Sequence, residues 1–249
     1  MAGFFSALQF LTVLPAPLAR PMDRPSFSLG YFPLVGLLLG AIVAGLDWLL
    51  RQFLPLSLAN GSVIVAMIAL TGGLHLDGFM DTCDAIPGAH STTRRLEILK
   101  DLRIGSYGIL GVVSLLMAKY LALAALPMAL RLPSLLLMPV IGRWSMTLAI
   151  TAFPYARASG LGKSMKEGAV WWSLALATIL AAAIVTATLQ STGVMALAGA
   201  CVLTLLMGWH FARRLNGLTG DTYGAVNEVV EMAVLIMIPL AAAAYRIPS

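Results

Sequence analysis

The chain has 249 residues, of which 59% are hydrophobic and only 11% charged, and its formal net charge is +5. Soluble globular domains carry about 25% charged residues, so this composition excludes a soluble enzyme and indicates a polytopic membrane protein. The hydrophobic runs leave no stretch long enough for a separate soluble domain. We therefore predict one integral membrane domain over residues 1–249, in contact with membrane lipid and without a nucleic-acid partner.

The hydrophobic segments predict the elements in chain order. Residues 4–14 are apolar but too few to span a bilayer, and Pro15 and Pro17 end the stretch, which predicts an interfacial or re-entrant helix. Seven later segments approach the roughly 20 apolar residues that a spanning helix needs. They are residues 33–54, 60–76, 106–129, 133–153, 169–189, 193–211 and 229–246. The expected fold class is an all-α membrane bundle whose short second and last spans continue into polar extensions.

Basic residues set the expected orientation, because Lys and Arg in short loops stay on the cytoplasmic side. Threading the seven spans places most of the cations on one side: Arg20, Arg24, Arg94, Arg95, Lys100, Arg103, Arg157, Lys163, Lys166, Arg213 and Arg214. Only Arg51, Arg131 and Arg246 fall on the other side, and Lys119 and Arg143 lie within spans. This bias predicts a multi-pass protein of the cytoplasmic (inner) membrane, with its N-terminus and active site facing the cytoplasm.

Eight of the eleven carboxylates gather in two polar stretches, residues 75–101 and 216–231. Carboxylates beside lipid are costly, so such clusters point to a function. Asp77, Asp81 and Asp84 stand at i, i+4 and i+7, which places them on one face of a helix. Hard oxygen ligands at this density suit Mg²⁺, with Mn²⁺ as the alternative, when substrate phosphates complete the coordination. A solvated helix end is the competing interpretation.

The residues around the three aspartates carry weaker signals. His75 lies off their shared face and is expected to be structural. Glu97, Lys100, Asp101 and Arg103 fall within two helical turns. They predict either an ordinary charged interfacial helix or a further carboxylate accompanied by phosphate-binding cations.

The second polar stretch combines a glycine-flanked Asp221 with Asn227, Glu228 and Glu231 just before the last predicted span. Acids at a helix N-terminus are favoured by the helix dipole, which is the structural interpretation of the glutamates. Arg214, just upstream, is a natural partner for a diphosphate or for these acids.

The sequence gives weaker indications of oligomeric state and of cysteine oxidation. Cys83 and Cys201 are too few and too isolated for a disulfide framework, so both are expected to be reduced. The small-residue segments 36–40 and 193–200 suit close helix packing or self-association as a homodimer.

Three long motifs, 71-TGGLHLDGFMDTCDA-85, 95-RLEILKDLRIGSYGILGV-112 and 219-TGDTYGAVNEVVE-231, resemble the signatures of the cobalamin-5'-phosphate synthase family, the adenosylcobinamide-GDP ribazoletransferases. The flanking segments 7-ALQFLTVLPAP-17 and 31-YFPLVGLLLG-40, and Arg143 followed by 154-PYARASGLG-162, occur in the order which that family shows. The resemblance therefore covers essentially the whole chain.

The resemblance implies a membrane enzyme that joins α-ribazole, or its 5'-phosphate, to adenosylcobinamide-GDP and releases GMP with the help of a divalent metal. An oxygen nucleophile must then attack a diphosphate, and metal ions and cations stabilise the developing charge. The expected metal ligands are Asp77, Asp81 and Asp84. The expected substrate-binding groups are Lys100, Arg103, Arg214, Asn227 and Glu228. The general base is expected to be either Asp101 or Asp221.

Two other functions fit parts of the pattern. A CDP-alcohol phosphotransferase also displays aspartates on membrane helices, but its Asp-Gly is followed shortly by Ala-Arg, whereas here Asp77-Gly78 precedes 79-FMDT-82. A cation transporter predicts carboxylates in the middle of spans, and only Asp47 approaches that position in the predicted arrangement.

Overall fold

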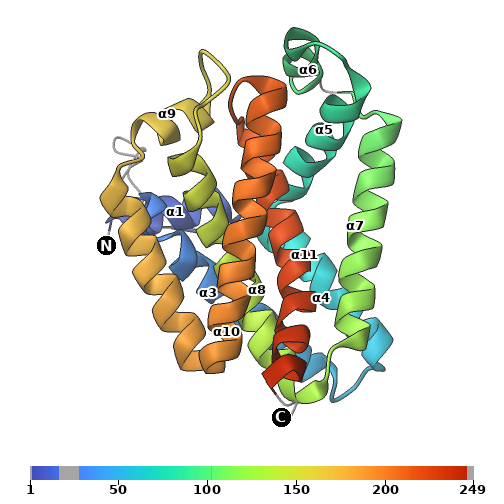
Figure 1. Cartoon of the computed structure of the whole chain (residues 1–249). Helices are drawn as coiled ribbons and strands as arrows, with labels where there is room; N and C mark the ends of the chain where they lie inside the picture. The colour runs from blue at the N-terminus through green and yellow to red at the C-terminus, as the bar shows by residue number, and fades with distance from the viewer. Residues whose placement is uncertain (1, 17–27, 102, 246–249) are drawn as a thin grey trace.

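The structure is a computed structural model that describes residues 2–16, 28–101 and 103–245, and helices account for nearly all of its regular structure (Figure 1). Most of the helices run lengthwise, side by side, in one bundle. In chain order they are α1 (Ala2–Leu11), α3 (Phe32–Leu50), α4 (Leu56–Thr71), α5 (Leu74–Gly88), α6 (Thr92–Ile98), α7 (Ser106–Ala125), α8 (Met128–Ala152), α9 (Leu161–Glu167), α10 (Trp171–Leu215) and α11 (Gly220–Tyr245). The expected all-α fold class is confirmed.

The number of spans agrees with the sequence. Within the described residues, α3, α7, α8, α10 and α11 are each long and apolar enough to cross a membrane, and α4 and α5 pass the same test together. The 45 residues of α10 form two helices, because Gln190 has non-helical backbone angles, φ 49° and ψ −128°. The chain doubles back there, as Figure 1 shows. Counting both halves of α10 and the α4–α5 pair gives seven spanning segments.

Of the two predicted polar extensions, one is wrong and one is confirmed. The second span does not continue into the acidic stretch, because Gly72 and Gly73 adopt left-handed conformations, φ 61° and 71°, and the axes of α4 and α5 differ by 94°. Glycine adopts this conformation without steric cost, which is why the pair ends α4. The last span does continue into its polar stretch, as predicted, and α11 begins at Gly220, before the apolar segment that starts at residue 229. Thr219 and Thr222 cap it reciprocally, each backbone N–H donating to the other's Oγ1 at 2.8 and 3.3 Å.

Helix α8 forms the centre of the apolar core and packs against α3, α10 and α11. Nearly all of its side chains between residues 134 and 150 are buried. A Cβ at Gly36 would lie 2.7 Å from the Val140 Cα, and one at Gly40 would lie 2.9 Å from the Leu136 Cα. The small-residue segment 36–40 therefore serves packing within the chain.

The predicted N-terminal helix is present as α1, which lies across the bundle beside α3 (Figure 1). Ala7, Leu8 and Leu11 are buried, and the ring of Phe10 stacks on that of Phe32 at 6.3 Å between centroids. Elsewhere in the described chain, Cys83 and Cys201 are unpaired, as expected.

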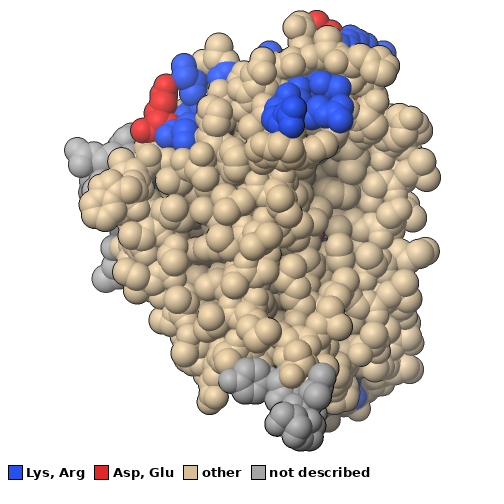
Figure 2. Space-filling view, viewed as in Figure 1, with Lys and Arg blue, Asp and Glu red and all other residues tan. Residues whose placement is uncertain are grey.

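Charged side chains gather at one end of the bundle. Most of the Lys and Arg visible in Figure 2 lie at the upper end, where Figure 1 places α6 and α9. Arg51 and Arg131 instead contact Asp47 near the end of α3. Arg20, Arg24 and Arg246, which also entered the predicted charge bias, lie outside the described residues. The end near α6 and α9 is called the charged end below.

Candidate functional site

Close packing of α5 against α11 brings the two polar stretches together. A Cβ at Gly78 would lie 2.8 Å from the Asp221 Cα, and one at Gly224 would lie 2.9 Å from the His75 carbonyl oxygen. Glycine at both positions lets the two backbones approach. His75 is buried in this contact, and it lines the same cavity as Asp77 and Asp221.

A short parallel bridge fixes the loop after α8 beside the start of α11. The Ala156 N–H donates to the Leu218 carbonyl and the Leu218 N–H donates to the Pro154 carbonyl, both at 2.8 Å. Gly217 has φ 146° and lies so close to this loop that a Cβ there would be 2.8 Å from the Ala156 nitrogen. The bridge places Arg157, which follows Ala156, next to Asp221.

Arg157 links three parts of the site. Its Nη2 donates to Asp221 Oδ2 at 2.6 Å and to the Leu99 carbonyl, just after α6, at 2.9 Å. The Thr219 hydroxyl donates to the same Asp221 oxygen at 3.2 Å. The Arg157 side chain is 17% exposed, so the ion pair is only partly screened by solvent. Arg157 was predicted to lie on the side that holds most of the cations but was not predicted as a site residue, although the motif 154-PYARASGLG-162 contains it.

The cavity around these residues has a volume of about 230 Å³ and takes its walls from α1, α5, α8, α9, α11 and the loop after α8. Its lining comprises Phe10, Leu74, His75, Asp77, Gly78, Met146, Tyr155, Arg157, Gly160, Gly162, Met165, Gly220, Asp221, Tyr223 and Gly224. One wall is aromatic, because the rings of Tyr155 and Tyr223 lie 6.4 Å apart. Burial raises the pKa of the Tyr155 hydroxyl, which keeps it a neutral hydrogen-bond donor.

Negative charge exceeds positive charge at this site. The Asp81 carboxylate is repelled by Asp77, Asp221 and Asp84 and attracted by Arg157. No group of three or more His, Cys, Asp or Glu side chains converges on one point within the described chain. The metal ligands predicted from the sequence therefore stay a prediction; of the three aspartates, Asp77 lines the cavity.

Asp84 has a visible structural partner. Its Oδ2 accepts a hydrogen bond from the Gly105 N–H and its Oδ1 accepts one from the Gly108 N–H, both at 2.8 Å. Because the first amides of a helix have no partner within the helix, this carboxylate caps the N-terminus of α7. The structure thus ties Asp84 to α7, whereas Asp77 lines the cavity.

The groups predicted after α6 lie outside the cavity. Arg103 donates from Nε to Asp101 Oδ1 at 3.0 Å and from Nη2 to Asp101 Oδ2 at 2.7 Å, and the pair is exposed. These hydrogen bonds lower the pKa of Asp101 to about 2, so this carboxylate is a poor proton acceptor at neutral pH. Lys100 is exposed to solvent. Of the two alternative bases, Asp221 is the one that lines the cavity.

Arg214 also lies away from the cavity. Its backbone carbonyl accepts hydrogen bonds from Thr92 Oγ1 and Arg95 Nη1, at 3.1 and 3.2 Å, which holds α6 on the end of α10. Its side chain is exposed beside Trp209 on the outer surface of α10. The structure does not bring this cation to the acidic residues.

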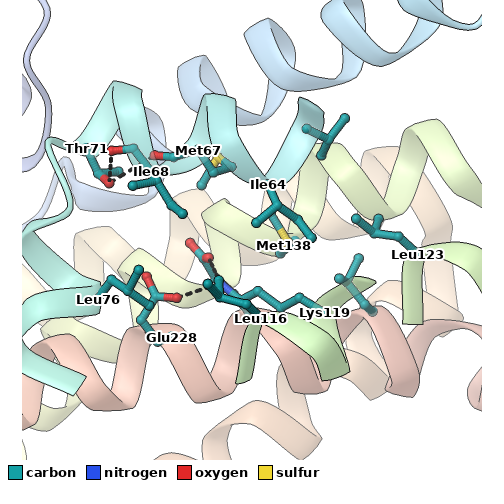
Figure 3. A pocket seen from close by; sticks show the side chains of 13 residues that line it. Ile64, Met67, Ile68, Thr71, Leu76, Leu116, Lys119, Leu123, Met138 and Glu228 are labelled. Carbon is teal, nitrogen blue, oxygen red and sulfur yellow. Dashed lines mark hydrogen bonds and ion pairs between the residues drawn. The ribbon is translucent and has the colours of Figure 1, made fainter. Parts of the chain in front are cut away.

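Asn227 and Glu228 belong to a buried charge cluster inside the bundle. Lys119 Nζ donates to Glu228 Oε2 at 2.6 Å and to Glu231 Oε2 at 2.8 Å, and Figure 3 shows Lys119 reaching toward Glu228. Arg143 pairs with Glu231, which also accepts a hydrogen bond from Asn227 at 3.3 Å. The dipole interpretation of the glutamates is wrong, because α11 begins at Gly220 and its interior carries them. Two cations within predicted spans were the available signal for this pairing.

A second buried network neutralises Asp47. Arg131, which is completely buried, donates to both carboxylate oxygens of Asp47 and to Asn60 Oδ1 at 2.6 Å. Arg51 adds a bond to Asp47 at 2.8 Å. The carboxylate that comes nearest to what a transporter would use therefore lies near the end of α3, where it is paired with Arg131 and Arg51.

These features define a class: a multi-pass membrane protein that keeps a carboxylate-rich cavity toward the charged end of its bundle. The chain belongs to the cobalamin-5-phosphate synthase family, whose model matches residues 3–239. It is 40% identical over 238 residues to the adenosylcobinamide-GDP ribazoletransferase of Desulforamulus reducens, covering 94% of each chain. It is 38% identical over 245 residues to the protein of that name from Klebsiella pneumoniae, covering 94% of this chain and 98% of that one. No solved structure matches the chain significantly.

Proposed function

We propose that this chain is an adenosylcobinamide-GDP ribazoletransferase acting in cobalamin nucleotide-loop assembly. It transfers the adenosylcobinamide-phosphate group from adenosylcobinamide-GDP to α-ribazole, or to α-ribazole 5'-phosphate. The products are adenosylcobalamin, or its 5'-phosphate, and GMP. The observation that carries the proposal is full-length similarity to relatives of that name, at up to 40% identity, combined with a cavity built from the same polar motifs.

The cavity supplies the groups that a phosphoryl transfer needs. The acceptor hydroxyl oxygen forms a bond to the corrinoid-side phosphorus, and the bond from that phosphorus to the GMP oxygen breaks, so GMP leaves with the electron pair. We assign to Asp221, which lines the cavity, the role of accepting the proton of the attacking hydroxyl. Arg157 offers a guanidinium to the phosphoryl oxygens, whose charge grows in the transition state.

We assign Mg²⁺, or Mn²⁺, to the side of the cavity that Asp77 lines, with Asp81 following four residues later on α5. Magnesium is usually held by one or two carboxylates together with substrate phosphates rather than by a complete protein cage. A site with two free carboxylates and an excess of negative charge fits that mode of binding. When bound, the ion would neutralise the diphosphate; Asp77 and Asp81 would orient it.

We also propose that the charged end faces the cytoplasm in the bacterial or archaeal inner membrane. The cations of α6, α9 and the second half of α10 support this orientation, because basic loops are retained on the cytoplasmic side. The nucleotide-activated substrate would then reach the cavity from the compartment where nucleotides are made.

Release of GMP by the purified protein in lipid vesicles tests the proposal. With adenosylcobinamide-GDP, α-ribazole and Mg²⁺, we expect GMP and a cobalamin product, both abolished by EDTA and restored by added Mg²⁺. A protein that releases no GMP with either α-ribazole or its 5'-phosphate does not perform this reaction, and a panel of CDP-alcohols would then be assayed.

A further inference from the structure

An apolar groove lies on the outer face of the bundle and has no role in the proposed reaction. It encloses about 470 Å³ between α5, α7, the second half of α10 and α11. Its walls include Phe79, Ile86, Leu110, Met207 and Phe211. Figure 2 shows a hollow running down this face, between the positions of α7 and α10 in Figure 1. The groove shares no lining residue with the carboxylate-rich cavity.

Along α10, the residues that line this groove are followed by two cations. Met207, Phe211 and Arg214 stand at i, i+4 and i+7, so the apolar face of α10 that lines the groove continues directly into Arg214. Arg214 and Arg213 are exposed and, with Trp209 and His210, line a second hollow of about 440 Å³. Neither hollow has an Asp or Glu among its lining residues. A cluster of cations sits above the hollow in Figure 2.

Aromatic side chains indicate the depth of this end in a bilayer. Tyr107, in the first turn of α7, is 53% exposed, and Trp209, near the end of α10, is 55% exposed. The Arg213 guanidinium lies over the Trp209 ring, 4.9 Å from its centroid. Exposed Tyr and Trp collect where lipid headgroups meet the acyl chains. The two arginines therefore lie at headgroup level, and the groove extends from them into the acyl region.

We propose that this surface is a specific site for an anionic phospholipid. One acyl chain lies in the groove, and the phosphate and anionic headgroup contact Arg213 and Arg214. An apolar channel with cations only at its headgroup end matches the charge and shape of that lipid. A soluble phosphate compound has no acyl chain that would fill the apolar groove. The same site explains why Arg214 points away from the cavity.

Native mass spectrometry of the full-length protein, released from detergent and titrated with phosphatidylglycerol or phosphatidylcholine, tests the site. We expect one phosphatidylglycerol to bind preferentially per chain and to resist competition by inorganic phosphate. In Arg213→Gln/Arg214→Gln that preference should fall by about tenfold or more, since each cation at a membrane surface contributes about 1 kcal/mol. Arg213→Lys/Arg214→Lys should keep most of it.

The matched control is Arg94→Gln/Lys163→Gln, which removes two exposed cations on α6 and α9 and should leave the preference intact. A second variant, Met207→Trp, fills the groove without changing charge and should also weaken retention of phosphatidylglycerol. Equal binding of both lipids, or an equal loss in the control, would overturn the proposal. So would a dimer whose interface displaces lipid from the groove. Because no substrate is present, the result is independent of the proposed reaction.

Discussion

Asp81 lies among three other carboxylates. Removing its charge therefore separates a role in metal binding from a role in stability. We predict that Asp81→Asn abolishes GMP release while the thermal unfolding midpoint stays level or rises, because the amide removes repulsion from Asp77, Asp84 and Asp221. Circular dichroism and the GMP assay, run on the same preparation, measure both quantities. Near-normal turnover in this variant would remove Asp81 from the metal site.

Arg157 is the cation that the cavity contains. Replacing it by Gln removes a donor that faces the phosphoryl group and should lower kcat by about 100-fold or more, in line with other donors that stabilise transition-state charge. Arg94→Gln is the matched control, because Arg94 forms an exposed pair with Glu97 outside the cavity. If both variants lost activity equally, or neither did, Arg157 would have no special part in the reaction.

At the scale of elements, the contact between α5 and α11 depends on a glycine. Gly78→Ala would place a methyl group against the Asp221 backbone, and such overpacking costs about 1–3 kcal/mol. Gly45→Ala on α3 is the control, since a Cβ there meets no atom within 4 Å, and it should be neutral or slightly stabilising. Unfolding midpoints in detergent compare the two variants. The same midpoint in both would mean that the helices are not held this closely.

The buried cluster of Lys119, Glu228 and Glu231 predicts a strong coupling between helices α7 and α11. Lys119→Met leaves the buried Glu228 without its cation, while Glu231 keeps Arg143, and should cost about 3–5 kcal/mol, as for other broken buried ion pairs. Lys119→Met/Glu228→Gln removes one charge of each sign and should recover a large part of that cost. A double-mutant cycle on the free energy of unfolding measures the coupling, and strict additivity would contradict the pairing.

At the scale of the whole molecule, hydrophobic run lengths were sufficient to predict the all-helical fold and the number of spans. They could not predict the 94° bend, because Gly72 and Gly73 signal a helix end without giving the direction in which the chain leaves. The shortness of the last run did predict a helix that continues into the polar stretch, but not its first residue, which the Thr219–Thr222 cap sets at Gly220.

The candidate site was only partly predicted, because the sequence does not show how the helices pack. The spacing of residues along the chain indicated the aspartates of α5, which share one helical face, and the glycine-flanked Asp221 within its motif. It could not find that Arg157 reaches Asp221 across 64 positions of sequence, or that Lys119 reaches Glu228 across 109. Such contacts depend on how the helices pack, so the ion-pair partner of a charged residue cannot be predicted from its charge alone.

The most direct test follows the corrinoid-side phosphorus. Adenosylcobinamide-GDP labelled at that phosphorus is supplied with α-ribazole and Mg²⁺ to the purified protein in vesicles, and the products are separated by chromatography. We predict that the label appears in the cobalamin product and that unlabelled GMP forms in equal amount. Label in inorganic phosphate, in GMP or only in unreacted substrate would contradict a transfer carried out by this protein.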